Sequence, residues 1–140
     1  MQLFFKVQKP LDFVFNYLTD MQLFASVHPV ITRIVHEGNN YYKVFETIQL
    51  GPIPVSFTYK AILEFDHSQH KVTIIATVMR FTKIEMYFHL SEQDGCCTIN
   101  ESIQFRSVLP IKGIMKNIFK SQHTKLFGNI NNLQIPILPL

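Results

Sequence analysis

The stretch YYKVFETIQLGPIPVSFTYKAILEF, Tyr41–Phe65, predicts two strands joined by a turn at Gly51-Pro52-Ile53-Pro54. Folding the chain at this four-residue turn brings apolar side chains together on one face. The apolar pairs are Leu50 with Val55, Ile48 with Phe57, Val44 with Ala61, and Tyr42 with Leu63. One pair on the same face is polar, because Glu46 falls opposite Tyr59. The question is why an apolar face carries a carboxylate beside a phenol.

The bulk composition predicts a single globular domain. The chain has 140 residues, of which 47% are hydrophobic and 16% charged. It has no apolar run long enough to span a bilayer and no signal peptide, so we expect a cytoplasmic protein without stable membrane insertion. The net charge of +3 is too small to indicate a nucleic-acid partner. Cys96 and Cys97 are adjacent, a spacing that strains a disulfide, and we expect two reduced thiols.

The elements can be placed from hydrophobic spacing and turn residues. A first strand is predicted over Gln2–Gln8, and Pro10 then opens a short helix. Asp20 is a candidate N-cap for a second short helix, which ends at His28-Pro29. Between Val30 and Val108 the apolar period is two, with turn signals at short intervals, and this predicts five or six antiparallel strands. Pro110 opens a final long helix that runs to about Asn131. The fold class is therefore α+β, in the order strand, two short helices, six strands and a long helix.

A second hairpin, turning at Asp94-Gly95, places another carboxylate on the inner face. The predicted pairs are Leu90 with Ile99, Phe88 with Glu101, Met86 with Ile103, and Ile84 with Phe105. On the preceding strand Val72, Ile74, Ala76 and Val78 alternate inward. Two interpretations of Glu101 stay open, since a slip or bulge of one residue would turn it outward, and the outward interpretation is slightly preferred. His36 is a further candidate polar group on this face.

The final helix has a broad apolar side when drawn on a helical wheel. That side carries Ile111, Ile114, Met115, Ile118, Phe119, Leu126 and Leu133. Lys112, Lys116 and Lys120 lie opposite and are interpreted as a solvated stripe, with contact to anionic lipid headgroups as the alternative. Gln122 lies near the centre of the apolar side, where its amide needs a hydrogen-bond partner.

Two stretches carry a resemblance to a known superfamily. VQKPLDFVFNYLTDMQLFASVHPVI near the N-terminus and LPIKGIMKNIFKSQHTKLFGNI near the C-terminus resemble the START-like, or SRPBCC, helix-grip superfamily, which includes polyketide cyclase/dehydrase-like and lipid-transfer proteins. The resemblance covers the chain to about Asn131. Ala25-Ser26-Val27 replace the usual aromatic before His-Pro, and the proline-containing tail is outside the pattern. The resemblance implies a curved seven-stranded antiparallel sheet that grips the last helix around a cavity for an apolar ligand. We therefore expect one domain over residues 1–132 and an apolar tail over residues 133–140.

The expected ligand site combines polar anchors with an apolar lining. Glu46, Tyr59, Gln122 and Glu101 are the candidate anchors. The candidate apolar lining residues are Phe57, Ala61, Ala76, Met86, Phe88, Ile103, Met115, Ile118 and Phe119. In the alternative interpretation, Glu46 and Tyr59 only satisfy each other near the end of the sheet.

No motif for metal binding, nucleophilic catalysis or phosphate binding is visible, and we predict no cofactor. His28 is interpreted as a helix-end residue rather than a catalyst. His36, His67, His70, His89 and His123 lack metal-ligand spacing.

Three functions follow from these features. The first is a soluble carrier or sensor for a small hydrophobic, lipid-like molecule. The second is a cyclase or dehydratase acting on a polyketide-like or aromatic substrate, with Glu46 and Tyr59 as acid and base. The third is a protein-interaction role in which the tail packs on the domain or on a second copy of the chain, as in a homodimer.

Overall fold

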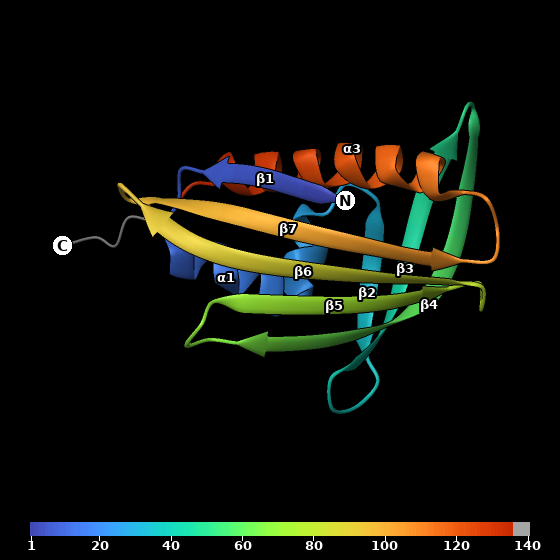
Figure 1. Ribbon diagram of the computed structural model, residues 1–140, viewed down its shortest axis with the longest axis horizontal. Helices are drawn as coiled ribbons and strands as arrows, with labels where there is room; N and C mark the ends of the chain where they lie inside the picture. Colours follow the sequence, from blue (N-terminus) through green and yellow to red (C-terminus); the bar gives the residue numbers. More distant parts are fainter. Residues whose placement is uncertain (136–140) are drawn as a thin grey trace.

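The computed structural model describes residues 1–135, apart from the side chain of Leu50, and shows a curved sheet wrapped around a long helix (Figure 1). The predicted order of elements is confirmed, with six strands after the two short helices. The elements are β1 Gln2–Val7, α1 Leu11–Thr19, α2 Met21–Val27, β2 Ile31–His36, β3 Tyr41–Leu50, β4 Ile53–Asp66, β5 Lys71–Val78, β6 Thr82–Gln93, β7 Cys96–Ser107 and α3 Lys112–Asn131.

The seven strands form one antiparallel sheet in the order β1-β7-β6-β5-β4-β3-β2. Strands that follow each other along the chain are neighbours from β2 to β7, as short turns require. β1 then closes the other edge by pairing with β7. The sheet bends so far that β3 and β4 run across the direction of β5, β6 and β7 and rise toward the start of α3 (Figure 1).

The two short helices form where local chemistry predicts them. α1 buries Leu11, Val14, Phe15 and Leu18, which recur at helical spacing. Asp20 ends α1 and caps α2, since its side chain accepts hydrogen bonds from the backbone N–H groups of Gln22 and Leu23. The predicted cap and the predicted end of α2 at His28 are both confirmed.

The register of the β6–β7 hairpin is confirmed in all four predicted pairs. The predicted register of β3 and β4 is wrong by two residues. Leu50 pairs with Ile53, and Glu46 pairs with Phe57 rather than Tyr59. The turn contains only Gly51 and Pro52, because Gly51 adopts a positive φ of 63° and allows a two-residue hairpin. A shift of two residues keeps every side chain on its predicted face.

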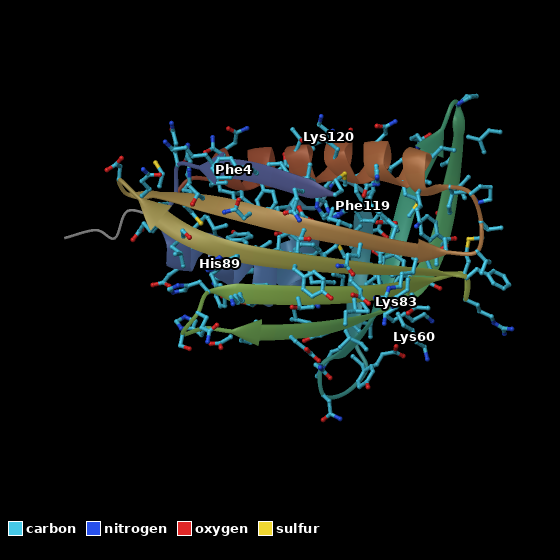
Figure 2. All side chains as sticks on the ribbon, viewed as in Figure 1. Phe4, Lys60, Lys83, His89, Phe119 and Lys120 are labelled. Atoms are coloured by element: carbon cyan, nitrogen blue, oxygen red, sulfur yellow. The ribbon has the colours of Figure 1, made fainter. Side chains whose placement is uncertain are left out.

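The wheel prediction for α3 is wrong in its first half. The buried residues of α3 are His123, Leu126, Phe127 and Ile130. Ile114, expected on the apolar side, is 64% exposed. In Figure 2, Phe119 lies on the sheet side of α3 and Lys120 on the opposite side, so the wheel is correct for this neighbouring pair. Only the second half of α3 is packed firmly on the core.

The core fills one end of the molecule and leaves the other hollow. At the filled end the Phe127 ring packs against Phe5 and Phe88, with ring centroids 4.6 and 6.2 Å away. α1 packs on β6 and β7 at this end, and α3 packs on β1. The predicted tail over residues 133–140 is described only in part. Leu133 packs against the core, and residues 136–140 lie outside the described part of the chain.

Candidate functional site

A cavity of about 300 Å³ lies between the bent sheet, α2 and the first half of α3. This volume is at the lower end of the range of ligand pockets, about 300–1,000 Å³. The residues that line it are Met21, Phe24, His28, Ile31, Ile34, Val44, Glu46, Ile48, Val55, Phe57, Tyr59, Ala61, Ile74, Ala76, Val78, Met79, Phe81, Thr82, Ile84, Met86, Leu109, Ile111, Met115, Ile118, Phe119, Gln122 and His123.

Glu46 and Tyr59 project into the cavity from the bent part of the sheet. Tyr59 is a diagonal neighbour of Glu46, because Glu46 pairs directly with Phe57. The Tyr59 hydroxyl still donates a long hydrogen bond of 3.5 Å to Glu46 Oε1. The expected contact is therefore present, although the register on which it was predicted is wrong.

Burial sets the protonation of this pair. Glu46 is only 9% exposed, and its desolvation raises the carboxyl pKa from 4.5 to about 7. The hydrogen bond from Tyr59 and the proximity of His123 act in the opposite direction and are smaller. The pKa of the Tyr59 hydroxyl is raised, first by burial and then by the neighbouring Glu46. Near neutral pH the site thus holds a carboxyl group poised between its two protonation states and a phenol that stays protonated.

His28 lines the cavity from the end of α2. Its Nδ1 accepts hydrogen bonds from the backbone N–H groups of Val30, at 3.3 Å, and Ile31, at 3.2 Å. Burial lowers the pKa of this imidazole to about 3, and His123 contributes to the shift. The prediction of a helix-end residue is confirmed, and His28 has in addition a position on the cavity wall.

His123 and Glu101 form a buried pair between α3 and β7. His123 Nδ1 lies 2.8 Å from Glu101 Oε1 and 2.6 Å from Oε2, and the hydrogen-bond geometry favours Oε1. Glu101 is fully buried and His123 is 2% exposed. The outward interpretation of Glu101 is therefore wrong. Its carboxylate lies behind the cavity wall, where it holds the imidazole ring that lines the cavity.

Most of the predicted ligand-site residues lie at this cavity. Those that line it are Glu46, Phe57, Tyr59, Ala61, Ala76, Met86, Met115, Ile118, Phe119 and Gln122. Phe88, Glu101 and Ile103 are buried around His123 but do not line the cavity. His36 is exposed beside Tyr42 near the β2–β3 turn, so it is not a polar group of the site.

The sequence interpretation missed both cavity histidines. His123 could have been found, since Phe119, His123, Leu126 and Ile130 recur at the spacing of one helix face. His28 carries no comparable signal, because its role depends on how α2 closes over the sheet.

The arrangement is suited to holding an apolar molecule next to a few polar groups. Of the lining residues only His28, Glu46, Tyr59, Thr82, Gln122 and His123 are polar. Within residues 1–135 no cluster of three potential metal ligands occurs. No helix in the described part of the chain is long and apolar enough to cross a bilayer.

The architecture and the enclosed site are those of the START/SRPBCC helix-grip class, as the sequence resemblance predicts. Within this class a family model narrows the identification. The model for CoxG, the G-type subunit of carbon monoxide dehydrogenase, matches residues 4–118, and the chain belongs to this family.

Solved structures support the fold. Ara h 8.0201 superposes with a TM-score of 0.76 at 15% identity, covering 94% of this chain and 93% of the other. A START superfamily protein from Mycobacterium smegmatis gives 0.73 at 12% identity, covering 96% and 98%. The Zhui aromatase/cyclase from Streptomyces sp. R1128 gives 0.66 at 12% identity, covering 94% and 90%. No curated protein matches the sequence. At these identities the likeness concerns the fold.

Proposed function

We propose that this protein binds a small, mainly apolar molecule in the cavity between the sheet and α3. The observation that carries the proposal is the cavity itself. Folding for stability alone fills a protein interior, because every unfilled apolar volume costs free energy. Here small side chains keep the interior open, since Ala61 and Ala76 face each other across β4 and β5 at the cavity wall.

The mouth of the cavity supports a binding role. Met79 and Phe81 from the β5–β6 turn and Leu109 from the β7–α3 loop line the cavity and are also exposed. An apolar ligand could pass between these side chains without crossing a polar barrier. The family name is that of a component of an enzyme, which is compatible with a binding protein that serves a catalytic partner. The proposal places this carrier in the cytoplasm and assigns binding to residues 1–132.

The test combines ligand detection with filling of the cavity. Native mass spectrometry of the purified protein should detect a bound apolar molecule, or fluorescence titration with naphthalene should show saturable binding. The Ala76→Leu variant adds three carbon atoms at the cavity wall, at roughly 30 Å³ each, and should weaken naphthalene binding at least about tenfold. Thr77→Leu adds an apolar side chain on the exposed face of the same strand and should leave binding unchanged. Equal binding by wild type and Ala76→Leu would count against the cavity as the site.

A second candidate function is acid–base catalysis of a cyclase or dehydratase type. It is favoured by the pKa of Glu46, about 7, next to a phenol in an apolar cavity. Two of the similar structures are named as aromatase/cyclase proteins, which agrees with this candidate. If Glu46 is the acid–base group, Glu46→Gln abolishes turnover of a bound polyketide-like or aromatic substrate and leaves its binding intact. Unchanged turnover in that variant would exclude Glu46 from the role.

A further inference from the structure

Two imidazole rings stand close together at one side of the cavity, each fixed by the protein through the same nitrogen. The ring centroids of His28 and His123 are 6.4 Å apart, and the rings meet edge to face. Each ring uses Nδ1 for a contact with the protein. Within residues 1–135, neither Nε2 atom has a hydrogen-bond partner. Both residues line the cavity, so the two Nε2 atoms are available to whatever occupies it.

The proton of His28 can be placed from its contacts. Nδ1 accepts from two backbone N–H groups, those of Val30 and Ile31, so it cannot carry a proton itself. A neutral imidazole then has its proton on Nε2. The low pKa of His28 agrees with a ring that stays neutral. His28 therefore presents a hydrogen-bond donor through Nε2.

The contacts of His123 leave its Nε2 more versatile. Nδ1 faces the Glu101 carboxyl group, which holds the ring in place. With the proton on Nδ1, Nε2 accepts a hydrogen bond when the ring is neutral and donates one when the ring is protonated. The rings of Phe24 and Phe119 lie 5.4 Å from His28 and His123 respectively, so the two polar atoms are set among apolar side chains.

We propose that Nε2 of His28 and Nε2 of His123 together bind an uncharged oxygen group of the ligand, a hydroxyl or a carbonyl. The ligand class is then an apolar molecule with one neutral oxygen function, rather than a pure hydrocarbon or a carboxylate. A hydroxyl fits because it accepts from His28 and donates to His123, and a carbonyl fits because it accepts from His28 alone or from both rings. A carboxylate is disfavoured because Glu46 lines the same cavity and repels it when ionised. This inference rests on the proposed binding function and deepens it.

The test uses four probes with the same hydrocarbon body: naphthalene, 2-naphthol, 2-acetonaphthone and 2-naphthoate. The affinity of each oxygen-bearing probe is expressed relative to naphthalene, which cancels changes in cavity volume. Wild type should bind 2-naphthol and 2-acetonaphthone about fivefold to tenfold more tightly than naphthalene, as one or two hydrogen bonds provide, and 2-naphthoate most weakly.

Asparagine substitutions isolate the Nε2 atoms from the structural contacts of the rings. In His28→Asn the amide oxygen can still accept from Val30 and Ile31, and in His123→Asn the amide N–H can still donate to Glu101. Both variants lack the atom that corresponds to Nε2. Each should reduce the preference for 2-naphthol over naphthalene to near unity. His89→Asn, on the exposed face of β6, is the matched control and should keep the wild-type preference (Figure 2).

The outcomes separate this inference from the proposed function. If all four probes bind wild type equally well, or if both asparagine variants keep the preference, the two-histidine site is refuted while the cavity remains a binding site. If no probe binds, the proposed function fails as well. NMR of the imidazole nitrogens in wild type supplies a readout that needs no variant. Addition of 2-naphthol should shift both Nε2 resonances, and an unchanged spectrum at saturation refutes the site.

Discussion

Glu46 shows how one residue couples protonation to folding. The unfolded chain holds this carboxyl at its ordinary pKa of 4.5, whereas burial in the fold raises the pKa to about 7. A raised carboxyl pKa means that the folded state binds the proton more tightly than the unfolded state. The stability of the protein must therefore fall as pH rises from about 4.5 to about 7, and the lost stability is not recovered at higher pH.

Glu46→Gln should remove this dependence. An amide has nearly the same shape and does not ionise, so the variant should gain about 3 kcal/mol over wild type at about pH 8 and almost nothing at about pH 4. Urea unfolding across this range measures the difference. Tyr59 and His123 also face the carboxyl, and both remain in the two proteins compared. Glu64→Gln, an exposed carboxylate on β4, is the control and should show a flat difference. A Glu46→Gln difference that does not change with pH would contradict the raised pKa.

At the scale of single elements, two glycines should respond oppositely to the same substitution. Gly51 has a φ of 63° in the β3–β4 turn, and an added Cβ would meet no other atom there. Gly51→Ala should therefore cost about 1 kcal/mol from backbone strain alone. Gly128 lies inside α3, also with open space around its Cα, and Gly128→Ala should stabilise by about 0.5–1 kcal/mol. Chemical denaturation measures both. A neutral Gly51→Ala would mean that the turn is not the two-residue form.

The Glu101–His123 pair joins the two elements that enclose the cavity, β7 and α3. His123→Leu leaves the Glu101 carboxylate buried without its partner and should cost about 3–5 kcal/mol. The double variant Glu101→Leu/His123→Leu removes both groups and should be more stable than His123→Leu alone. A double-mutant cycle by urea unfolding gives this coupling. If the two single costs simply add, the pair contributes no interaction of its own.

At the scale of the whole molecule, the fold could be predicted from the sequence further than the site. Alternation of apolar residues and strong turns placed all seven strands, and Asp94-Gly95 determined a register because those residues favour one kind of tight turn. Gly51-Pro52 is compatible with a two- or a four-residue turn, so the register of Glu46 could not be determined locally. The cavity depends on contacts between distant segments. His28 is placed by the docking of α2, and the exposure of Ile114 follows from α3 packing on the core only through its second half.

That division of α3 predicts how the molecule moves. No residue of α3 before His123 is buried, and Met115, Ile118 and Phe119 face the cavity instead of a packed core. Segments with few buried apolar contacts open at low free-energy cost, so the amides of residues 115–121 should exchange hydrogen faster than those of residues 124–131. A ligand that fills the cavity supplies the missing contacts and stabilises the closed form. Saturation with 2-naphthol should slow exchange in the first half of α3 and change the second half little. The Ala76→Leu variant, whose cavity is partly filled, should show slower exchange without ligand and a smaller response to it. Uniform exchange along α3 in the free protein would show that the cavity does not weaken the helix above it.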